Sequence, residues 1–407
     1  MLDGIEWVIG QVQSIDSVRP GAQELTCLVN DVAKPALAYT DLLGELAVGD
    51  RVWLNQRAQS LGLGTGGQAL VIAPVTTQPA APDVHPSRTS AQRQNISTSS
   101  SAPNVDKTPA RPAGRDHQPP DGDIDSGYLV KARYTPLQVT VRGVDSPHSP
   151  HHRVMQQATS LEGMPVVVAD LHSSLPAICA GALVDNSAVR IAYVMTDGAA
   201  LPAAYSRTIH QLRQARMLVS VITAGQAFGG DHEAVSVHSA LLAARHVVKA
   251  ELAVVSQGPG NLGSFTPWGF SGLAVGDAVN AVSILQGKPV GCLRLSGADP
   301  RPRHFGLSHH SLTSYGRVAL APADLVMPIL TGQLAELGDK IKQSVLELTK
   351  PKGQHNLIEL PTAPLLEALQ ELASVGVNLS TMGRGLHEDP AAFLAAAAAG
   401  RHAANLL

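Results

Sequence analysis

The sequence predicts an α/β protein: a mostly parallel sheet flanked by helices, preceded by a small N-terminal β-barrel-like domain. Two patterns support this prediction. From about residue 164 onward, short apolar runs without alternation are separated by helical stretches of roughly 11 to 20 residues, as in repeated βα units. Before residue 76, apolar residues instead alternate in short runs between turn residues, which is typical of a small barrel.

The composition limits the function. The 407 residues exceed a typical domain of about 100–200 residues, so two or three units are expected. Hydrophobic residues make up 44%, enough to bury a sizeable core and to exclude wholesale disorder. The 30 Lys and Arg against 33 Asp and Glu leave a net charge of −3, which argues against nucleic-acid binding by bulk charge.

Residues 1–75 are predicted to form the barrel, of the SH3-like or OB-like kind. Residues 76–126 carry eight prolines, seven serines and no aromatic residue, so we predict a disordered linker or insertion there. Residues 127–163 are predicted to be connecting strands and a loop, which could complete the barrel or add an edge to the next domain. The β-type runs of these parts lie at 5–12, 24–29, 36–39, 51–55, 70–75, 128–134 and 138–142.

Residues 164–407 are predicted to form the α/β domain with the ligand site. Eight βα units would also fit a (β/α)8 barrel, but their uneven lengths favour an open, doubly wound sheet. The segment 231–249 has an apolar stripe at helical spacing, with Asp231 as its N-cap. The expected strands lie at 166–169, 191–195, 218–222, 252–255, 290–295, 325–330, 357–360 and 377–379.

Three glycine-rich loops are candidates for phosphate binding. Two match G-x-G-x-x-G, at 62–67 and 258–263, but a strand rather than a helix follows the first. In the second, Pro259 removes a backbone N–H and the next helix is delayed. The third loop, 225–231, leads from a strand into the helix predicted at Asp231, so its N–H groups could bind an anion, although the Asp231 carboxylate would compete.

Polar side chains follow several predicted strands and would converge if the strands are parallel. Carboxylates beside histidines could do acid–base chemistry or hold a divalent metal. The candidates for these catalytic roles are Asp170, His172, Asp197, Asp231, His309 and His310. The candidates for ligand binding through backbone, amide or guanidinium groups are Gly229, Gly230, Gly258, Gly260, Asn261, Arg301 and Arg303. Each of them could instead be a loop residue that caps a helix or stabilises a turn.

The three cysteines are too few and too widely spaced to form a disulfide framework. This cysteine content indicates a reducing compartment. The N-terminal residues lack the features of a signal peptide. The alanine-rich run at 391–399 is about half of the ~20 residues that a membrane helix needs. We therefore expect a cytoplasmic protein that does not enter a membrane.

Several distinctive stretches resemble a bacterial family known only as domain of unknown function 3866. This resemblance implies a cytoplasmic bacterial protein in which both folded parts belong together, and it assigns no activity, substrate or cofactor. The linker is longer than is usual in the family. The stretches are GDRV at 49–52, LGLGTGG at 61–67, KARYTPLQ at 131–138, VMTDGAALP at 194–202, GQAFGGD at 225–231, SHHSLT at 308–313 and STMGRGL at 380–386.

Two hypotheses of function remain open at this stage. The first is an enzyme, or former enzyme, that binds a small polar, anionic ligand at the carboxyl ends of its strands and performs hydrolysis or group transfer. The second is a non-catalytic adaptor whose barrel binds RNA or a protein partner, with RNA disfavoured by the few cations of the barrel. The sequence leaves the cofactor, the metal and the substrate unknown, and its many small residues are compatible with a homo-oligomer.

Overall fold

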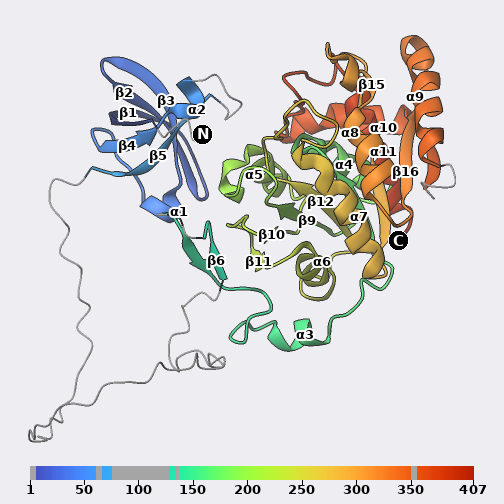
Figure 1. Ribbon diagram of the computed structural model, residues 1–407, viewed down its shortest axis with the longest axis horizontal. Coiled ribbons are helices and arrows are strands. Elements are labelled where there is room, and N and C mark those ends of the chain that lie inside the picture. The colour runs from blue at the N-terminus through green and yellow to red at the C-terminus, as the bar shows by residue number, and fades with distance from the viewer. Residues whose placement is uncertain (1–5, 61–66, 76–128, 134, 136, 350–354) are drawn as a thin grey trace, which may run out of the picture.

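The computed structural model describes residues 6–60, 67–75, 129–133, 135, 137–349 and 355–407. The linker predicted at 76–126 lies outside the described residues, as does most of the glycine-rich loop at 61–67. Two folded parts are present, a barrel coloured blue in Figure 1 and a larger α/β part coloured from green to red.

The N-terminal part is a closed five-stranded barrel in the order β1-β2-β3-β5-β4. Its Greek-key order, with β3 and β5 parallel, matches the OB-like alternative. Alternating side chains such as Val12, Leu25 and Leu54 fill the interior. The elements are β1 (Trp7–Arg19), β2 (Ala22–Val29), β3 (Val32–Ala38), α1 (Thr40–Leu43), β4 (Arg51–Asn55), α2 (Arg57–Ser60) and β5 (Ala69–Pro74).

A short hairpin and a helix connect the two parts. Strands β6 (Leu129–Lys131) and β7 (Val139–Val141) pair with each other and do not enter the barrel. The chain after β7 then forms one parallel bridge with the edge of the larger sheet, between Gly143 and Glu233. Helix α3 (His152–Gln157) follows.

The larger part is built on an eight-stranded parallel sheet in the order β11-β10-β9-β12-β8-β13-β16-β17. The linear order confirms the open sheet over the (β/α)8 barrel, because β11 and β17 are two separate edges. The strands are β8 (Pro165–Ala169), β9 (Ile191–Thr196), β10 (Ser220–Ala224), β11 (His232–Ala234), β12 (Leu252–Gln257), β13 (Lys288–Cys292), β16 (Asp324–Ile329) and β17 (Asn356–Pro361).

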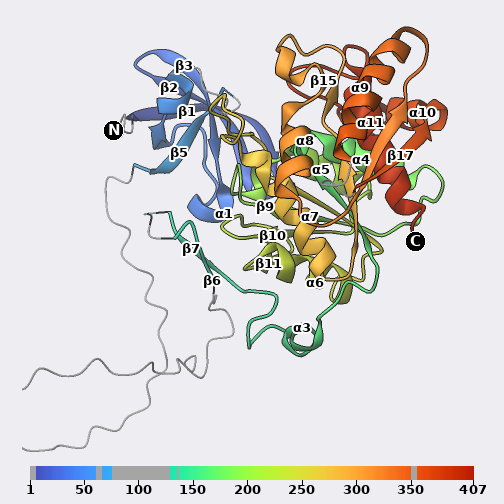
Figure 2. The same cartoon turned by 45° about the vertical axis from the view of Figure 1, so that its right-hand side comes forward.

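Helices cover both faces of this sheet, as predicted for a doubly wound fold. Helices α6 and α7 pack on one face, whereas α11 packs on the other face and against α4. The barrel lies beside the α5 end of the sheet (Figures 1 and 2). The helices are α4 (Leu175–Leu183), α5 (Arg207–Gln214), α6 (Val237–His246), α7 (Ala274–Ile284), α8 (His309–Thr313), α9 (Ala335–Leu348), α10 (Ala363–Glu371) and α11 (Pro390–Ala404).

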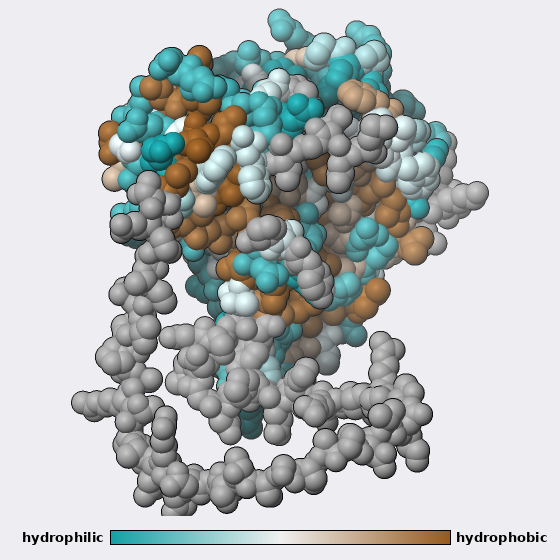
Figure 3. Space-filling view, turned by 60° about the vertical axis from the view of Figure 1, so that its left-hand side comes forward, coloured by the Kyte–Doolittle hydropathy of each residue, from teal (hydrophilic) through white to brown (hydrophobic). Residues whose placement is uncertain are grey.

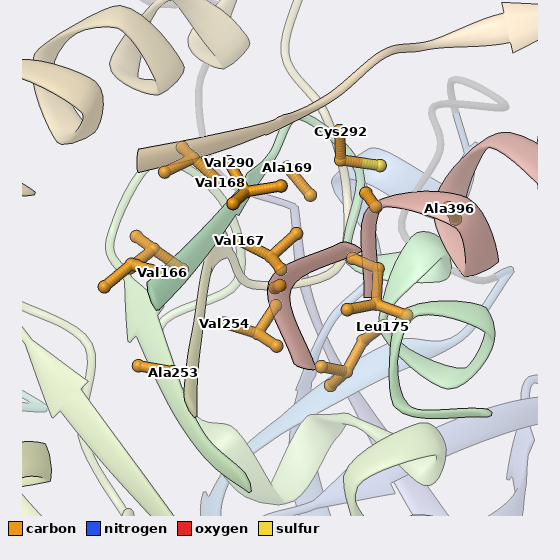
Figure 4. Close-up of a cluster of buried hydrophobic side chains, with 14 of the residues drawn as sticks. Val166, Val167, Val168, Ala169, Leu175, Ala253, Val254, Val290, Cys292 and Ala396 are labelled. Atoms are coloured by element: carbon orange, nitrogen blue, oxygen red, sulfur yellow. The ribbon is translucent and has the colours of Figure 1, made fainter. Parts of the chain in front are cut away.

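The central strand β8 explains why the apolar runs do not alternate. All five of its residues are buried, because helices cover the sheet on both sides. Figure 4 shows Val167 directed toward Leu175 and Ala396, with Val166 and Val168 on the opposite side of the strand. Both faces of the strand therefore contribute to one core.

Two sequence-based expectations about elements were wrong. The helix predicted at 231–249 is instead the edge strand β11 followed by α6, whose N-cap is Ser236 in a capping box. The strand predicted at 377–379 does not form; the chain there is irregular and leads back to α11. A three-residue apolar run carries too little pairing information to distinguish a strand from a buried loop.

The alanine-rich run belongs to α11, a buried helix of the core. In the part of the chain that the structure describes, no helix combines the length and apolarity needed to cross a bilayer. Two further short strands, β14 (Leu295–Ser296) and β15 (Gly306–Leu307), form an antiparallel pair beyond the carboxyl end of β13. The loop between them carries part of the candidate site.

Candidate functional site

The middle of the sheet contains a topological switch point. Strands β8 and β12 are hydrogen-bonded neighbours, yet the chain leaves β8 toward β9 and leaves β12 toward β13, on opposite sides. Connections that diverge in this way open a crevice beyond the carboxyl ends of the two strands, where open α/β sheets bind ligands. Asp170 directly follows β8 and Gln257 ends β12, so both stand at this crevice.

Asp170 is buried and is contacted by three polar side chains from different segments of the chain. Its Oδ2 accepts from Nη1 of Arg294 at 3.0 Å and lies 2.8 Å from Nδ1 of His310. Its Oδ1 accepts from Nδ2 of Asn261 at 2.8 Å. Burial raises the pKa of Asp170, but the hydrogen bond from His310 and the charge of Arg294 outweigh it and hold the pKa below its usual range.

The loop that carries Gly272 is shaped around this carboxylate. A Cβ at Gly272 would lie 1.8 Å from Oδ1 of Asp170, so only glycine fits there. Phe270, from the same loop, stacks on the imidazole of His310 with a ring separation of 3.7 Å. The loop before α7 therefore holds the Asp170–His310 pair from one side.

Three histidines lie together beside this pair. The rings of His304, His309 and His310 have centroid separations of 5.0, 5.0 and 4.5 Å. Burial and the nearby Arg294 and Arg301 lower the pKa of His304 to about 3. Burial and the neighbouring His310 lower the pKa of His309 to about 4. Both imidazoles are therefore neutral at physiological pH, as a proton acceptor or a metal ligand must be.

A cleft of about 410 Å³ lies between the switch point and the barrel. Asn261 and Gln257 line it on the side of the sheet, and Arg19 and Glu24 line it on the side of the barrel. Its volume is within the ~300–1,000 Å³ of typical ligand pockets. The Oε1 atom of Gln257 is buried and has no hydrogen-bond partner among the described residues. Through Asn261 the cleft is connected directly to Asp170.

His172 lines the same cleft, but both of its ring nitrogens are occupied by the protein. Nδ1 lies 2.9 Å from the Tyr193 hydroxyl, and Nε2 lies 2.7 Å from Oγ of Ser206, the N-cap of α5. Burial lowers the pKa of His172 to about 4. These contacts suit a neutral histidine that joins β9 to α5.

The two other predicted carboxylates do not join Asp170. Asp197 is exposed after β9, and its Oδ2 accepts from the backbone N–H of Gln226. Asp231 accepts from the backbone of Val221 near the amino end of β10 and pairs with Arg213 at 2.8 Å. Because β11 runs parallel to β10, the chain must first return to the amino end of β10, which takes Asp231 away from the crevice.

The predicted ligand-binding glycines divide into two groups. Gly258 and Gly260 line the cleft with Asn261, as expected for a loop at the end of β12. Gly229 and Gly230 instead donate to the side chains of Glu233 and Thr223. The loop at 225–231 enters strand β11 and not a helix, so the predicted helix N-terminus for an anion is absent there.

The two predicted arginines lie on the loop between β14 and β15. Arg301 pairs with Asp299 through two hydrogen bonds of 2.8 and 2.7 Å. Arg303 donates from Nε to Nε2 of His304 at 3.2 Å and lies over the ring of Phe265. Arg303 forms no ion pair with any carboxylate of the described residues, and it is therefore the better placed of the two for an anionic ligand.

Comparison with known proteins supports the resemblance. Residues 35–400 match the family described as "Protein of unknown function (DUF3866)". The chain belongs to the DUF3866 family. No curated protein and no solved structure matches it. The DUF3866 match runs from within the third barrel strand into α11, so it covers the whole sheet but only the end of β3, β4 and β5 of the barrel.

Sequence reasoning missed three residues of the site in this DUF3866 protein. Arg294 follows β13 by two residues, but the strand predicted at 290–295 included it, so it was not recognised as a residue at a strand end. Gly272 gave no usable signal, because its role depends on the approach of Asp170 from a segment about a hundred residues away. The third is His304, which lies between β14 and β15 and joins the histidine cluster but was not among the predicted candidates.

Proposed function

We propose that this protein is an α/β enzyme that binds a small polar molecule with an anionic group in the cleft between the sheet and the barrel. The observation that supports this most is the buried Asp170, which is held by Arg294 and His310 at the switch point and is connected to the cleft by Asn261. Structural ion pairs also occur in cores, but this one lies at the edge where α/β sheets bind ligands.

The anionic preference of the ligand follows from the arginines beside Asp170 and the histidine cluster, which adjoin the cleft without lining it. The Arg294 guanidinium is balanced by Asp170, and that of Arg301 by Asp299. Arg303 is left as a positive charge without a described carboxylate partner, at the histidine cluster. An arginine in this position can donate two parallel hydrogen bonds to a phosphate or carboxylate.

The chemistry that this site can perform is proton transfer during hydrolysis or group transfer. His309 is partly exposed, neutral, and forms no ring hydrogen bond within the described residues. A neutral imidazole can accept a proton from water or from a hydroxyl group of the ligand, or its free lone pair can bind a metal ion instead. Asp170 fixes the orientation of the neighbouring His310, as a buried carboxylate does for a histidine in acid–base catalysis.

The test is a thermal-shift screen of the full chain against phosphorylated and carboxylated metabolites. A ligand at 100 times its Kd should stabilise the fold by about 2.7 kcal/mol. Asn261→Ala should reduce this shift, measured from the melting temperature of the variant without ligand, whereas Asn378→Ala, an exposed residue elsewhere, should not. A hit that is unaffected by Asn261→Ala would place the ligand outside this cleft and contradict the proposal.

A second candidate function is a non-catalytic adaptor, and the outer surface of the barrel favours it. Figure 3 shows brown apolar surface among hydrophilic patches over the barrel. Trp7, Val18, Val32 and Val48 are exposed there. If the adaptor role holds, a well-folded sample should respond to no small molecule, and Val32→Glu should abolish association with a protein partner or with a second copy.

We also propose a cytoplasmic bacterial setting. Cys27, Cys179 and Cys292 are buried and form no disulfide. Burial raises the pKa of Cys27 to about 11 and those of Cys179 and Cys292 to about 12, so none is a reactive thiolate at neutral pH. The cysteines support a reducing compartment without a redox role. Expression of the chain with an export signal should then bring no gain in stability from disulfides.

A further inference from the structure

We propose that His304, His309 and His310 bind a divalent metal ion of the Zn²⁺ class. Each offers one ring nitrogen, and these three atoms all lie within 4.8 Å of one another. Three protein ligands with one remaining position are the usual set of a catalytic zinc site. Only the assignment of that remaining position to the anionic ligand rests on the function proposed above.

The spacing of the rings fits one shared ion. With Zn–N bonds of about 2.0–2.1 Å in a tetrahedral site, three imidazole nitrogens lie about 3.3 Å apart and their ring centres about 5 Å apart. The ring centroids of the three histidines are already separated by 4.5 to 5.0 Å. Binding would bring the nitrogens from 4.8 Å or less to ligand distance by rotation of the side chains, with little change in the separation of the rings.

Two of the three rings are held as metal ligands usually are. Nδ1 of His310 lies 2.8 Å from the Asp170 carboxylate, and Nδ1 of His304 lies 2.8 Å from Oγ of the buried Ser308. A hydrogen bond at Nδ1 fixes the tautomer and leaves Nε2 for the metal. Asp170 is thus a positioning residue that would make His310 a stronger ligand.

The positive charges of Arg294 and Arg301 near the cluster oppose the ion, and the most direct opposition comes from Arg303. It donates from Nε to Nε2 of His304 at 3.2 Å, which is the nitrogen that the metal would need. The side chain of Arg303 is partly exposed and can move away when the ion binds. Its positive charge would then attract an anionic group toward the remaining coordination position. The direction of the effect of Arg303→Ala on metal affinity follows: the variant should bind the metal at least as tightly as the unmodified chain.

The alternative is that the rings only pack together. Phe270 stacks on His310 and meets His309 edge to face, so an aromatic cluster without an ion is a complete description of the same contacts. The chain also has 16 histidines in all, including His148, His151 and His152 close together in sequence, which could bind a metal adventitiously. Metal content alone therefore does not discriminate between the two descriptions.

The experiment titrates the chelator-treated full chain with Co²⁺ alone and with Zn²⁺ alone. Calorimetry measures affinity, and the visible absorption of four-coordinate Co²⁺ reports the geometry. We expect one tight site whose affinity falls at least 100-fold in His309→Ala and 10–100-fold in Asp170→Asn. His210→Ala, a histidine of similar exposure on α5, should leave the affinity and the spectrum unchanged.

The proposal is overturned if the full chain shows no tight site, or if His309→Ala binds Co²⁺ with the affinity and spectrum of the unmodified chain. A weaker affinity in Arg303→Ala would also contradict it, because Arg303 would then support the ion instead of competing with it. His309 is only partly buried, so its variant should fold, and circular dichroism of each variant checks this. No ligand is needed, so a failed small-molecule screen and a failed metal titration are separate results.

Discussion

Asp170 is a buried carboxylate that side chains from three distant segments of the chain contact. Arg294, His310 and Asn261 together satisfy both of its oxygens. Removing the carboxylate would leave the buried Arg294 charge without a partner. A buried ion pair adds little to the net stability of a fold, because burying the charges costs free energy. Removing only one partner is strongly destabilising, because the other charge then stays buried without a partner.

We therefore expect Asp170→Ala to lower the free energy of unfolding by about 3–5 kcal/mol. Asp185→Ala breaks the exposed ion pair between Asp185 and Arg401. It should lower the free energy of unfolding by less than about 1 kcal/mol. Urea unfolding monitored by circular dichroism measures both. Equal losses of unfolding free energy in the two variants would show that the buried Asp170–Arg294 pair is no more important for stability than an exposed pair.

His172 predicts a dependence of stability on pH. Burial lowers its pKa to about 4, whereas an unfolded histidine titrates near 6.5, so between these values the unfolded chain binds more protons. The free energy of unfolding must then fall as the pH drops from about 6.5 toward 4, by about 3 kcal/mol from this residue.

Urea unfolding at pH 7 and pH 5 tests this prediction. His172→Gln has no titrating ring, so its stability should fall less between the two pH values than that of the unmodified chain. The comparison uses the difference between the two pH values, which removes any constant cost of the substitution. An identical pH dependence in the variant would contradict the assignment.

At the scale of secondary structure elements, the crossing of α4 and α11 relies on glycine. A Cβ at Gly181 would lie 1.9 Å from the carbonyl oxygen of Ala397, and a Cβ at Gly400 would lie 1.9 Å from that of Ile178. The two helix backbones are thus in direct contact. Small residues are required on both sides of this crossing, which accounts for the alanine-rich sequence of α11.

We expect Gly181→Ala to be destabilising, although alanine is the better helix former by about 1 kcal/mol. Overpacking typically costs about 1–3 kcal/mol, and here the clash is with a backbone atom that cannot rotate away. Gly385→Ala is the control, since the nearest atom to its Cβ would be 3.7 Å away. A melting temperature unchanged by Gly181→Ala would mean that the helices are farther apart than described.

At the scale of the whole molecule, the contact between the barrel and the α/β part sets both the docking of the barrel and the shape of the cleft. Glu24 of β2 accepts hydrogen bonds from Arg19 and from Arg207 of α5. Nε of Arg19 also donates to the carbonyl oxygen of Ala204 at 2.9 Å. The same residues form the barrel side of the cleft, so docking of the barrel and shape of the site are coupled.

Glu24→Gln should weaken this docking by about 2 kcal/mol, because hydrogen bonds to charged groups contribute about 1.5–3 kcal/mol. We expect the thermal unfolding to separate into two transitions and the barrel to become more sensitive to proteolysis. Glu162→Gln, which breaks an exposed pair with Arg245, should leave one transition. A single transition at an unchanged temperature in Glu24→Gln would contradict the coupling.

Local sequence was enough for the division into a barrel and an open α/β sheet, and for the position of Asp170 at the end of a central strand. Apolar runs of four to six residues, and the turns between them, depend on neighbouring residues alone. The position of Gly258, Gly260 and Asn261 at the end of a strand could be predicted for the same reason, since they follow a strongly apolar strand.

The order of the strands and the membership of the site depended on contacts between distant segments. Nothing near Asp231 indicates that β11 runs parallel to β10 and takes this carboxylate to the opposite end of the strand. Arg294 and Gly272 meet Asp170 only because β13 pairs with β8 and the loop before α7 closes over both. The pairing of strands is decided by packing across the whole core. A short stretch of sequence contains information only about its own secondary-structure propensity, so it cannot specify such pairing.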